Sequence, residues 1–258
     1  MLVDGSIKDI RHVDNRIVKT MCEDKVLWEF PQDDKIGAPG NRTLLAGNMD
    51  AGWFGEVSSS DFITGDELAR TIGLTAGVSQ YSNEPWLKFA YENDVYLIAK
   101  KPFRYSISWN SINAVNAVYG DRIIEIKGKK YAIMLPRGTG KDVQINPKVK
   151  ISGHWGTVNH NSMWNKLMLP IHQKAPSNWQ HPNNVKSPTE NWGVGYTDAD
   201  LITNSSNGNG SFGWCQETVY NASSHLYRGG AGVSASGLSH LSESEPAYGW
   251  RPVLKLVG

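Results

Sequence analysis

The sequence predicts a mixed α+β fold in which short strands and irregular loops outweigh helices. The 258 residues include 26 Gly, 10 Trp and 10 Tyr, a composition typical of loop-rich folds pinned by aromatic side chains. Short runs of β-branched and aromatic residues are bounded by turn-forming residues, which indicates strands. Three segments have the apolar spacing and the capping residues of a helix.

The N-terminal region, residues 1–30, carries three short segments with the character of strands, at 7–12, 16–21 and 25–30. They predict a small β-meander. A unit of this size cannot bury a core of its own, so we expect it to dock on a neighbour and to serve as an anchor. Residues 31–40 hold two Pro and two Gly without periodicity, which indicates a linker.

Residues 41–102 are expected to form a connecting α+β domain. Thr64 and Glu67 have the spacing of a capping box, in which each side chain satisfies a free amide at the start of a helix, and Gly73 would end that helix. The apolar segments 86–91 and 95–99 are separated by a short turn and predict a hairpin.

Residues 103–258 are expected to form the C-terminal domain. Helical spacing predicts a helix from Trp109 to Tyr119, capped by Ser108 and closed by Gly120. A hairpin is expected from 122–126 and 130–135, and a last helix over 162–168. Residues 173–249 are then rich in Asn, Ser, Gly and Trp, and loops of this length in a compact domain are usually functional.

The charge balance argues against several partners. Lys and Arg number 26 against 25 Asp and Glu, so a net charge of +1 provides no field for capturing nucleic acid or an anionic membrane. No apolar run approaches the roughly 20 residues of a membrane span. Cys22 and Cys215 lie in different expected domains, so no disulfide framework is predicted. We therefore expect a protein made and folded in a cytoplasm, with neither a nucleic-acid partner nor a membrane span.

Five short motifs carry a resemblance when taken in order. They are Ile107-Ser108-Trp109, Met163-Trp164-Asn165, Gly213-Trp214-Cys215-Gln216-Glu217, Leu226-Tyr227-Arg228-Gly229-Gly230 and Gly249-Trp250-Arg251-Pro252-Val253-Leu254. Together they resemble the signature of the formylglycine-generating-enzyme branch of the C-type-lectin-like fold. The resemblance implies a C-type-lectin-like domain over residues 103–258, in which the signature indoles fill the core and the arginines bond backbone carbonyls. The structural signature is Trp109, Trp164, Trp214, Arg228, Gly229, Trp250 and Arg251.

A second resemblance covers nearly the whole chain. Residues 51–57 (AGWFGEV), 63–65 (ITG) and 72–77 (IGLTAG), together with the terminal GWRPVL, resemble phage and prophage virion or tail proteins. This resemblance implies a tail-associated particle component that is located in the virion. It would contact other virion subunits through its N-terminal region, and we expect it to form a homo-oligomer.

No catalytic residues are predicted. The oxidase of the resembled family holds copper with a pair of cysteines, whereas the expected lectin-like region contains Cys215 alone, which we interpret as a buried framework residue. The histidines lack the spacing of metal ligands. Four carboxylates could converge for sugar cleavage, but no fixed spacing selects two of them: Glu190, Asp198, Asp200 and Glu217.

Candidate ligand-binding residues lie in the polar loops. Trp179, Trp192 and Tyr196 are outside the signature motifs and could stack on a sugar ring or contact a protein. Within 232–248, expected as a displayed loop and as the leading recognition site, the candidates are Ser234, Ser236 and His240. Asp198 and Asp200, followed by Asn204, Asn207 and Asn209, offer the oxygen ligands that calcium prefers, although hydration of these side chains is the simpler interpretation.

Three functions remain open. The first is a non-enzymatic virion component whose lectin-like domain binds a host-surface glycan or protein. The second is a purely architectural virion protein, such as a decoration, collar or fibre-base protein, whose loops contact other subunits. The third is an enzyme that acts on cell-wall polymer. No cofactor is expected beyond the candidate calcium ion.

Overall fold

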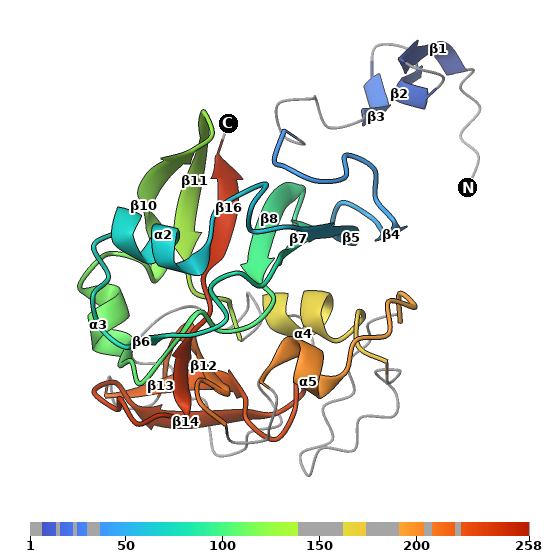
Figure 1. The fold of residues 1–258 in the computed structure, drawn as a ribbon. Coiled ribbons are helices and arrows are strands. Elements are labelled where there is room, and N and C mark those ends of the chain that lie inside the picture. Colours follow the sequence, from blue (N-terminus) through green and yellow to red (C-terminus); the bar gives the residue numbers. More distant parts are fainter. Residues whose placement is uncertain are drawn as a thin grey trace.

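The structure is a computed structural model that describes residues 7–13, 16–22, 25–29, 37–138, 162–173, 191–203, 208–219 and 223–257. It is a mixed α+β protein built mostly from strands, which form three sheets of three, seven and six strands (Figure 1). None of its helices is long and apolar enough to span a membrane within the described residues.

The three-stranded sheet contains the predicted N-terminal strands. It consists of β1 (Ile7–Val13), β2 (Arg16–Cys22) and β3 (Lys25–Glu29), all antiparallel, in the order β1-β2-β3. In the part of the chain that the structure describes, these strands pair only with one another. The predicted meander over residues 1–30 is therefore confirmed as three strands.

The seven-stranded sheet forms one layer of the main body. From one edge to the other its strands are β10 (Tyr119–Ile126), β11 (Lys129–Met134), β16 (Val253–Val257), β8 (Asp94–Ala99), β7 (Trp86–Tyr91), β5 (Ala51–Val57) and β4 (Ala46–Gly47). The hairpins expected around residues 92–94 and 127–129 are both present, as β7–β8 and β10–β11.

The boundary expected at residue 102 does not separate two sheets. Strand β16, near the C-terminus, lies between β8 and β11, and its Leu254 pairs with Leu97 on one side and Ile133 on the other. Val253 and Leu254 are completely buried, so β16 needs neighbours along both edges and on both faces. Residues 41–102 and 103–258 therefore share one sheet rather than forming two independent layers.

The six-stranded sheet lies below the first in the view of Figure 1. Its strands in order are β14 (Ser236–His240), β13 (Ser224–Gly229), β12 (Phe212–Val219), β15 (Tyr248–Trp250), β9 (Arg104–Tyr105) and β6 (Val78–Ser79). Strands β12 and β15 pair in parallel, whereas the other neighbours are antiparallel. This sheet also draws on both regions, because β6 precedes residue 102.

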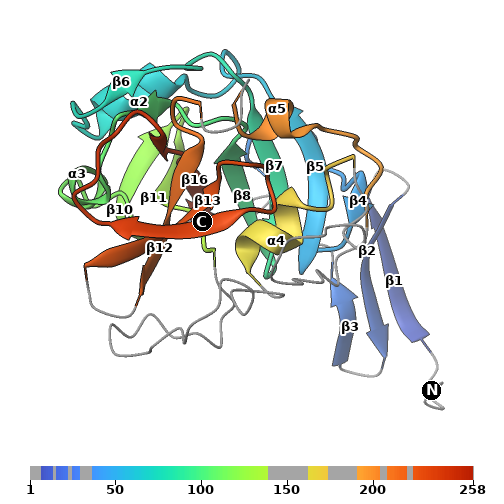
Figure 2. The same cartoon turned by 90° about the horizontal axis from the view of Figure 1, so that it is seen from below.

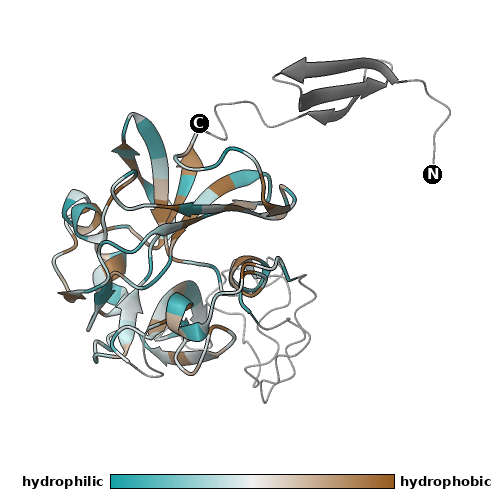
Figure 3. Ribbon diagram, turned by 45° about the vertical axis from the view of Figure 1, so that its right-hand side comes forward, coloured by the Kyte–Doolittle hydropathy of each residue, from teal (hydrophilic) through white to brown (hydrophobic). Residues whose placement is uncertain are grey.

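Alternate residues of the larger sheet enter two different hydrophobic clusters. In β7, Trp86 and Ala90 belong to one cluster, while Leu87 and Phe89 belong to the other. Because successive side chains of a strand point to opposite faces, the sheet is buried on both sides. Figure 3 shows the hydrophobic stretches along these strands.

All four described helices begin after an N-cap residue whose side chain accepts from the first turn, including the predicted Ser108 before α3 (Trp109–Asn113). Helix α2 (Gly65–Thr71) has the complete capping box of Thr64 and Glu67, and Gly73 beyond it adopts a φ of +68°. Helix α4 (Met163–Met168) begins at the N-cap Ser162 and packs against β5 and β7 (Figure 2). Helix α5 (Asp198–Leu201) has a second capping box, formed by Thr197 and Asp200, that the sequence did not predict.

The helix predicted from Trp109 to Tyr119 is much shorter than expected. Helix α3 spans only Trp109–Asn113, and Tyr119 already belongs to β10. The chain turns at Asn116, which adopts a φ of +56°. The Asn side chain can bond nearby backbone groups in non-helical conformations, and Asn tolerates the left-handed region, so the helix ends before this residue. The following residues pair as β10 with β11, although the apolar spacing would continue a helix.

The last residues of the expected linker, 37–40, pack against the body. Ala38 is 3% exposed, and the buried Lys88 of β7 donates from Nζ to the carbonyls of Ala38 (2.9 Å) and Asn41 (2.7 Å). Burial lowers the pKa of Lys88 to about 8, with a smaller contribution from the positive charge of Arg42. This contact fixes the point at which the chain enters the main body.

Candidate functional site

The smaller sheet brings three of the signature motifs together. Gly213 of β12 pairs with Arg228 of β13 on one side and with Gly249 of β15 on the other. Trp214, which follows Gly213 in the sequence, and Trp250, which follows Gly249, are both completely buried. Residues separated by 36 positions in the sequence therefore meet beside one short segment of β12.

The indole N–H groups of two signature residues tie helix α3 to this sheet. Trp214 Nε1 donates to the Ile107 carbonyl (2.8 Å), and Trp109 Nε1 donates to the Cys215 carbonyl (3.0 Å). Trp109 also lies against the His225 ring, with ring centroids 3.8 Å apart. Buried indoles normally need such acceptors, so these bonds fix the relative positions of the elements.

Two buried arginines, Arg228 and Arg251, lie over the ring of the buried Trp164. We call these three residues the arginine–indole framework. Their exposed fractions are 0%, 2% and 1%. The guanidinium carbons of Arg228 and Arg251 lie 5.7 and 5.2 Å from the centroid of the Trp164 ring. Cation–π contacts of this kind are strongest when both partners are removed from water.

Backbone and amide oxygens accept hydrogen bonds from both guanidinium groups, although Nε of each arginine has no partner among the described residues. Arg251 donates to the carbonyls of Ala99 (3.1 Å), Lys100 (2.6 Å) and Leu201, and Arg228 donates to the side-chain oxygen of Asn165. Burial lowers the pKa of both arginines. Acceptors directed at the charged form oppose this effect, so the guanidinium groups can stay protonated in the interior.

The framework also holds the loop that follows β13. Trp164 Nε1 donates to the Val233 carbonyl (2.7 Å), and the Val233 N–H donates to Asp198 Oδ1 (2.6 Å). Helices α4 and α5 thus hold one residue of this loop from two sides. Sequence reasoning missed Val233 and Asn165 as partners, because no motif spacing links them to residues 35 to 69 positions away.

Part of the expected displayed loop 232–248 is a strand. Ser236 and His240 are the two ends of β14, which pairs with β13 and forms an edge of the smaller sheet. His240 is exposed and its Nδ1 lies 2.7 Å from the Ser242 hydroxyl, while Ser234 and Ser236 are partly buried. Residues 224–228 pair with residues 236–240 in a continuous register, and residues 229–235 connect the two strands.

Trp192 and Tyr196 are half-buried rather than fully displayed. Trp192 packs beside Phe89, with ring centroids 6.4 Å apart. The Tyr196 hydroxyl donates to Glu56 Oε1 (2.6 Å), and Lys100 Nζ lies 4.5 Å from the Tyr196 ring centroid. These two side chains therefore help to hold residues 191–196 against the larger sheet. Trp179 lies outside the described residues.

The candidate calcium ligands have other partners. Asp198 bonds the Val233 N–H and lies 3.4 Å from His172 Nε2, whereas Asp200 caps α5 through Thr197. The main-chain carbonyl of Asn209 accepts from Gln80 (3.1 Å), and Asn204 and Asn207 lie outside the described residues. In the described ranges, no group of three or more His, Cys, Asp or Glu is arranged to hold a metal ion.

The three candidate carboxylates among the described residues are divided between a strand and a helix. Glu217, on β12, is 2% exposed and accepts from the Gly138 N–H (3.1 Å), while Asp198 and Asp200 are on α5. Glu190 lies outside the described residues. Burial raises the pKa of the neighbouring Cys215 thiol well above its usual range, which disfavours the reactive thiolate.

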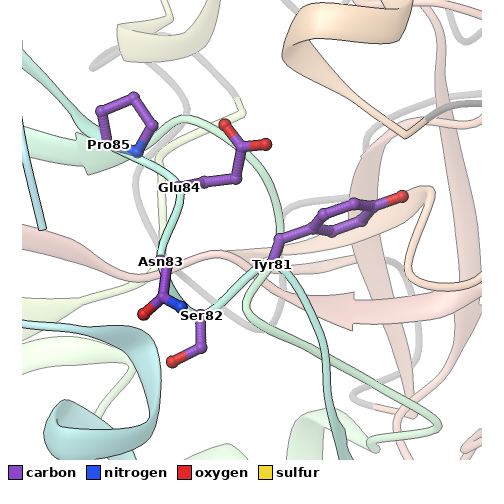
Figure 4. Close-up of a pocket in the computed structure, with 5 residues that line it drawn as sticks. All are labelled: Tyr81, Ser82, Asn83, Glu84 and Pro85. Carbon is purple, nitrogen blue, oxygen red and sulfur yellow. The ribbon is translucent and has the colours of Figure 1, made fainter.

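A separate hollow lies on the connection between β6 and β7. It has a volume of about 480 Å³ and is lined by five consecutive residues (Figure 4): Tyr81, Ser82, Asn83, Glu84 and Pro85. The buried Lys101 lies beside it, with its Nζ 4.8 Å from the Tyr81 ring centroid and 3.9 Å from Glu84 Oε1. No motif pointed to this loop, although its polar, turn-forming composition between two strands was a usable signal.

Comparison of the chain with family models, with curated proteins and with solved structures found no match.

Proposed function

We propose that the chain is a non-catalytic, tail-associated component of a bacteriophage particle. In this proposal residues 103–258 form a lectin-like domain whose loops bind a glycan or protein on the host surface, and residues 1–30 attach the chain to other virion subunits. The virion is the expected location, with assembly as a homo-oligomer. The motif resemblances suggest the particle, and the arrangement of the loops supports the binding role.

One observation carries the binding role: polar segments are mounted on a fully buried charged framework. The segment 230–235 is held through Val233, and the segment 191–203 is held through Leu201, whose carbonyl binds Arg251. Both segments therefore have a fixed base. Polar residues such as Asn191 and Ser234 lie fully or partly exposed, whereas Thr203 is buried. Recognition surfaces gain precision when variable loops stand on a rigid scaffold.

Binding to whole cells tests the proposal. Labelled full-length protein is incubated with a panel of bacterial strains, and saturable binding to at least one strain is expected. His240→Ala should weaken that binding about 5- to 30-fold, the effect of a hot-spot residue. Glu125→Ala, which changes an exposed residue on the distant strand β10, is the matched control and should bind normally. Melting temperatures of both variants should equal that of the wild type.

The architectural function makes the opposite prediction. If no strain binds the protein, while the protein still enters assembled particles, the loops contact other subunits and the adhesive role is wrong. Release of soluble products from purified envelope material would instead favour the cell-wall enzyme.

The anchor role of the N-terminal sheet has its own test. Deletion of residues 1–30 should leave the remainder folded, because β1, β2 and β3 pair only with one another within the described residues. The truncated protein should fail to enter particles. Normal incorporation would show that the attachment surface lies elsewhere.

A further inference from the structure

We propose that the hollow formed by Tyr81–Pro85 is a binding site for a neutral saccharide. This inference rests on the proposed recognition function and adds a contact site that is separate from the loops at 191–203 and 230–248. It is argued from the shape of the loop, its backbone conformation and the chemistry of its side chains.

Hydrogen bonds to other parts of the chain hold the loop 81–85 in one conformation. The Ser82 hydroxyl accepts from the Asp66 N–H at the start of α2 (2.8 Å), and the Asn83 carbonyl accepts from the Ser59 hydroxyl (2.9 Å). The Pro85 carbonyl accepts from the Lys100 N–H (3.1 Å). Three different segments thus hold five residues in place, so the hollow exists before any ligand arrives. Binding to a preformed site avoids the cost of ordering a loop.

Tyr81 adopts a backbone conformation that its side chain does not favour. Its φ is +46°, in the left-handed region where glycine and asparagine are usual and a bulky aromatic residue is an outlier. The turn could be made at lower cost with Asn or Gly. Backbone strain at the mouth of a hollow is typical of a site where the side chain itself is needed.

The exposed groups suit a ligand rich in hydroxyls. An aromatic ring offers a face for the C–H groups of a sugar ring, a carboxylate accepts hydrogen bonds, and the Asn83 amide both donates and accepts. Figure 4 shows the Tyr81 ring extending away from Ser82 and Asn83, so the stacking face and the amide lie at different parts of the hollow. The hollow is about 480 Å³ and lies wide open to solvent, so it presents a surface to a ligand rather than an enclosed cavity.

The local charges favour a neutral ligand over an anionic one. Lys101 is 7% exposed, and its amino group is engaged by the Tyr81 ring and by Glu84. The positive charge that would attract a phosphate or a uronic acid is therefore offset by an adjacent carboxylate that is itself 31% exposed. An anion would approach this carboxylate first, at a Coulombic cost.

The experiment measures saccharide binding by the full chain. Glucose, galactose and N-acetylglucosamine serve as neutral probes, and glucuronic acid and inorganic phosphate serve as anionic probes, each titrated while amide shifts are followed by NMR. We expect at least one neutral probe to bind saturably and the anionic probes not to bind. Glu84→Gln and Asn83→Ala should each weaken binding at least fivefold. The matched controls Glu125→Gln and Asn110→Ala change exposed residues elsewhere and should bind as the wild type does.

Tyr81→Asn separates a binding role from a structural one. Asn accepts the left-handed backbone, so this variant should fold with an unchanged or higher melting temperature and lose saccharide binding at least tenfold. Unchanged binding by this variant, absence of binding by every neutral probe, or preferential binding of the anionic probes would each overturn the inference. If neutral saccharides do not bind while wild-type protein still binds whole cells, only this site is refuted. Failure of the wild-type protein to bind any strain would refute the proposed function itself.

Discussion

Two cations placed over aromatic rings show how burial changes the role of the same interaction. In the arginine–indole framework, Arg251 lies over Trp164 and both are sealed from water. In the Tyr81–Pro85 hollow, Lys101 lies over Tyr81, which is only partly buried and borders open space. The sealed pair organises three segments of backbone, whereas the open pair leaves part of its ring available. Contact geometry alone therefore does not distinguish a structural site from a binding site; access of water does.

Trp164→Ala should have the largest effect on stability. It removes a completely buried indole, its hydrogen bond to Val233 and the ring beneath two guanidinium groups. The free energy of unfolding should fall by about 3–5 kcal/mol, as for other buried large aromatics truncated to Ala. Chemical denaturation monitored by circular dichroism measures this. A loss below about 1 kcal/mol would mean that the framework does not hold the domain together.

Acidification should destabilise the fold through the buried His225, which lies against Trp109. Burial, aided by the positive charge of His240, lowers the pKa of His225 from 6.5 to about 4. The folded state therefore binds fewer protons than the unfolded state between these values, so stability is complete above pH 6.5 and declines as the pH falls to 4. His225 Nδ1 has no hydrogen-bond partner among the described residues, and its protonation would bury an unpaired charge.

The expected loss is on the order of 2–3 kcal/mol between pH 6.5 and 4. Denaturation curves at several pH values measure it. In His225→Gln this part of the pH dependence should disappear, although the variant is less stable overall. The same slope in the variant and the wild type would assign the acid sensitivity to other groups.

Arg251→Lys tests how much the buried framework depends on the shape of the guanidinium group, because the variant keeps the positive charge but removes the planar set of donors. Arg251 serves carbonyls on two separate segments, which a single ammonium on a flexible stem cannot reproduce. We expect a loss of about 2 kcal/mol. Arg122→Lys is the matched control: Arg122 also donates to three carbonyls, those of Thr71, Ile72 and Val115, but it is only part-buried. Its loss should stay below about 1 kcal/mol, and equal losses would contradict the importance of burial.

Tyr81→Asn should have the smallest effect on stability. Removal of a partly exposed ring is offset by relief of the left-handed backbone at φ +46°, so the melting temperature should change little and the free energy of unfolding by no more than about 0.5 kcal/mol. Thermal unfolding provides the measurement. A loss comparable with that of Trp164→Ala would place Tyr81 in the structural class and remove the contrast between the two regions.

The sequence determined the local elements of this protein. The capping box of Thr64 and Glu67, the N-cap Ser108, the helix near 162–168 and the two hairpins were all predicted, because a helix start and a tight turn depend on residues within a few positions of each other. The same local reasoning failed for α3, where Asn116 turns the chain although the apolar spacing continues.

Tertiary structure alone decided which distant segments meet. The insertion of β16 between β8 and β11 joins the two regions that the sequence divided at residue 102, and Arg251 finds its acceptors about 50 and 150 residues away. Likewise the Tyr81–Pro85 hollow depends on hydrogen bonds from Ser59, Asp66 and Lys100. Such contacts form only after loops of many residues have closed, and their free energy depends on burial and geometry that no local pattern encodes.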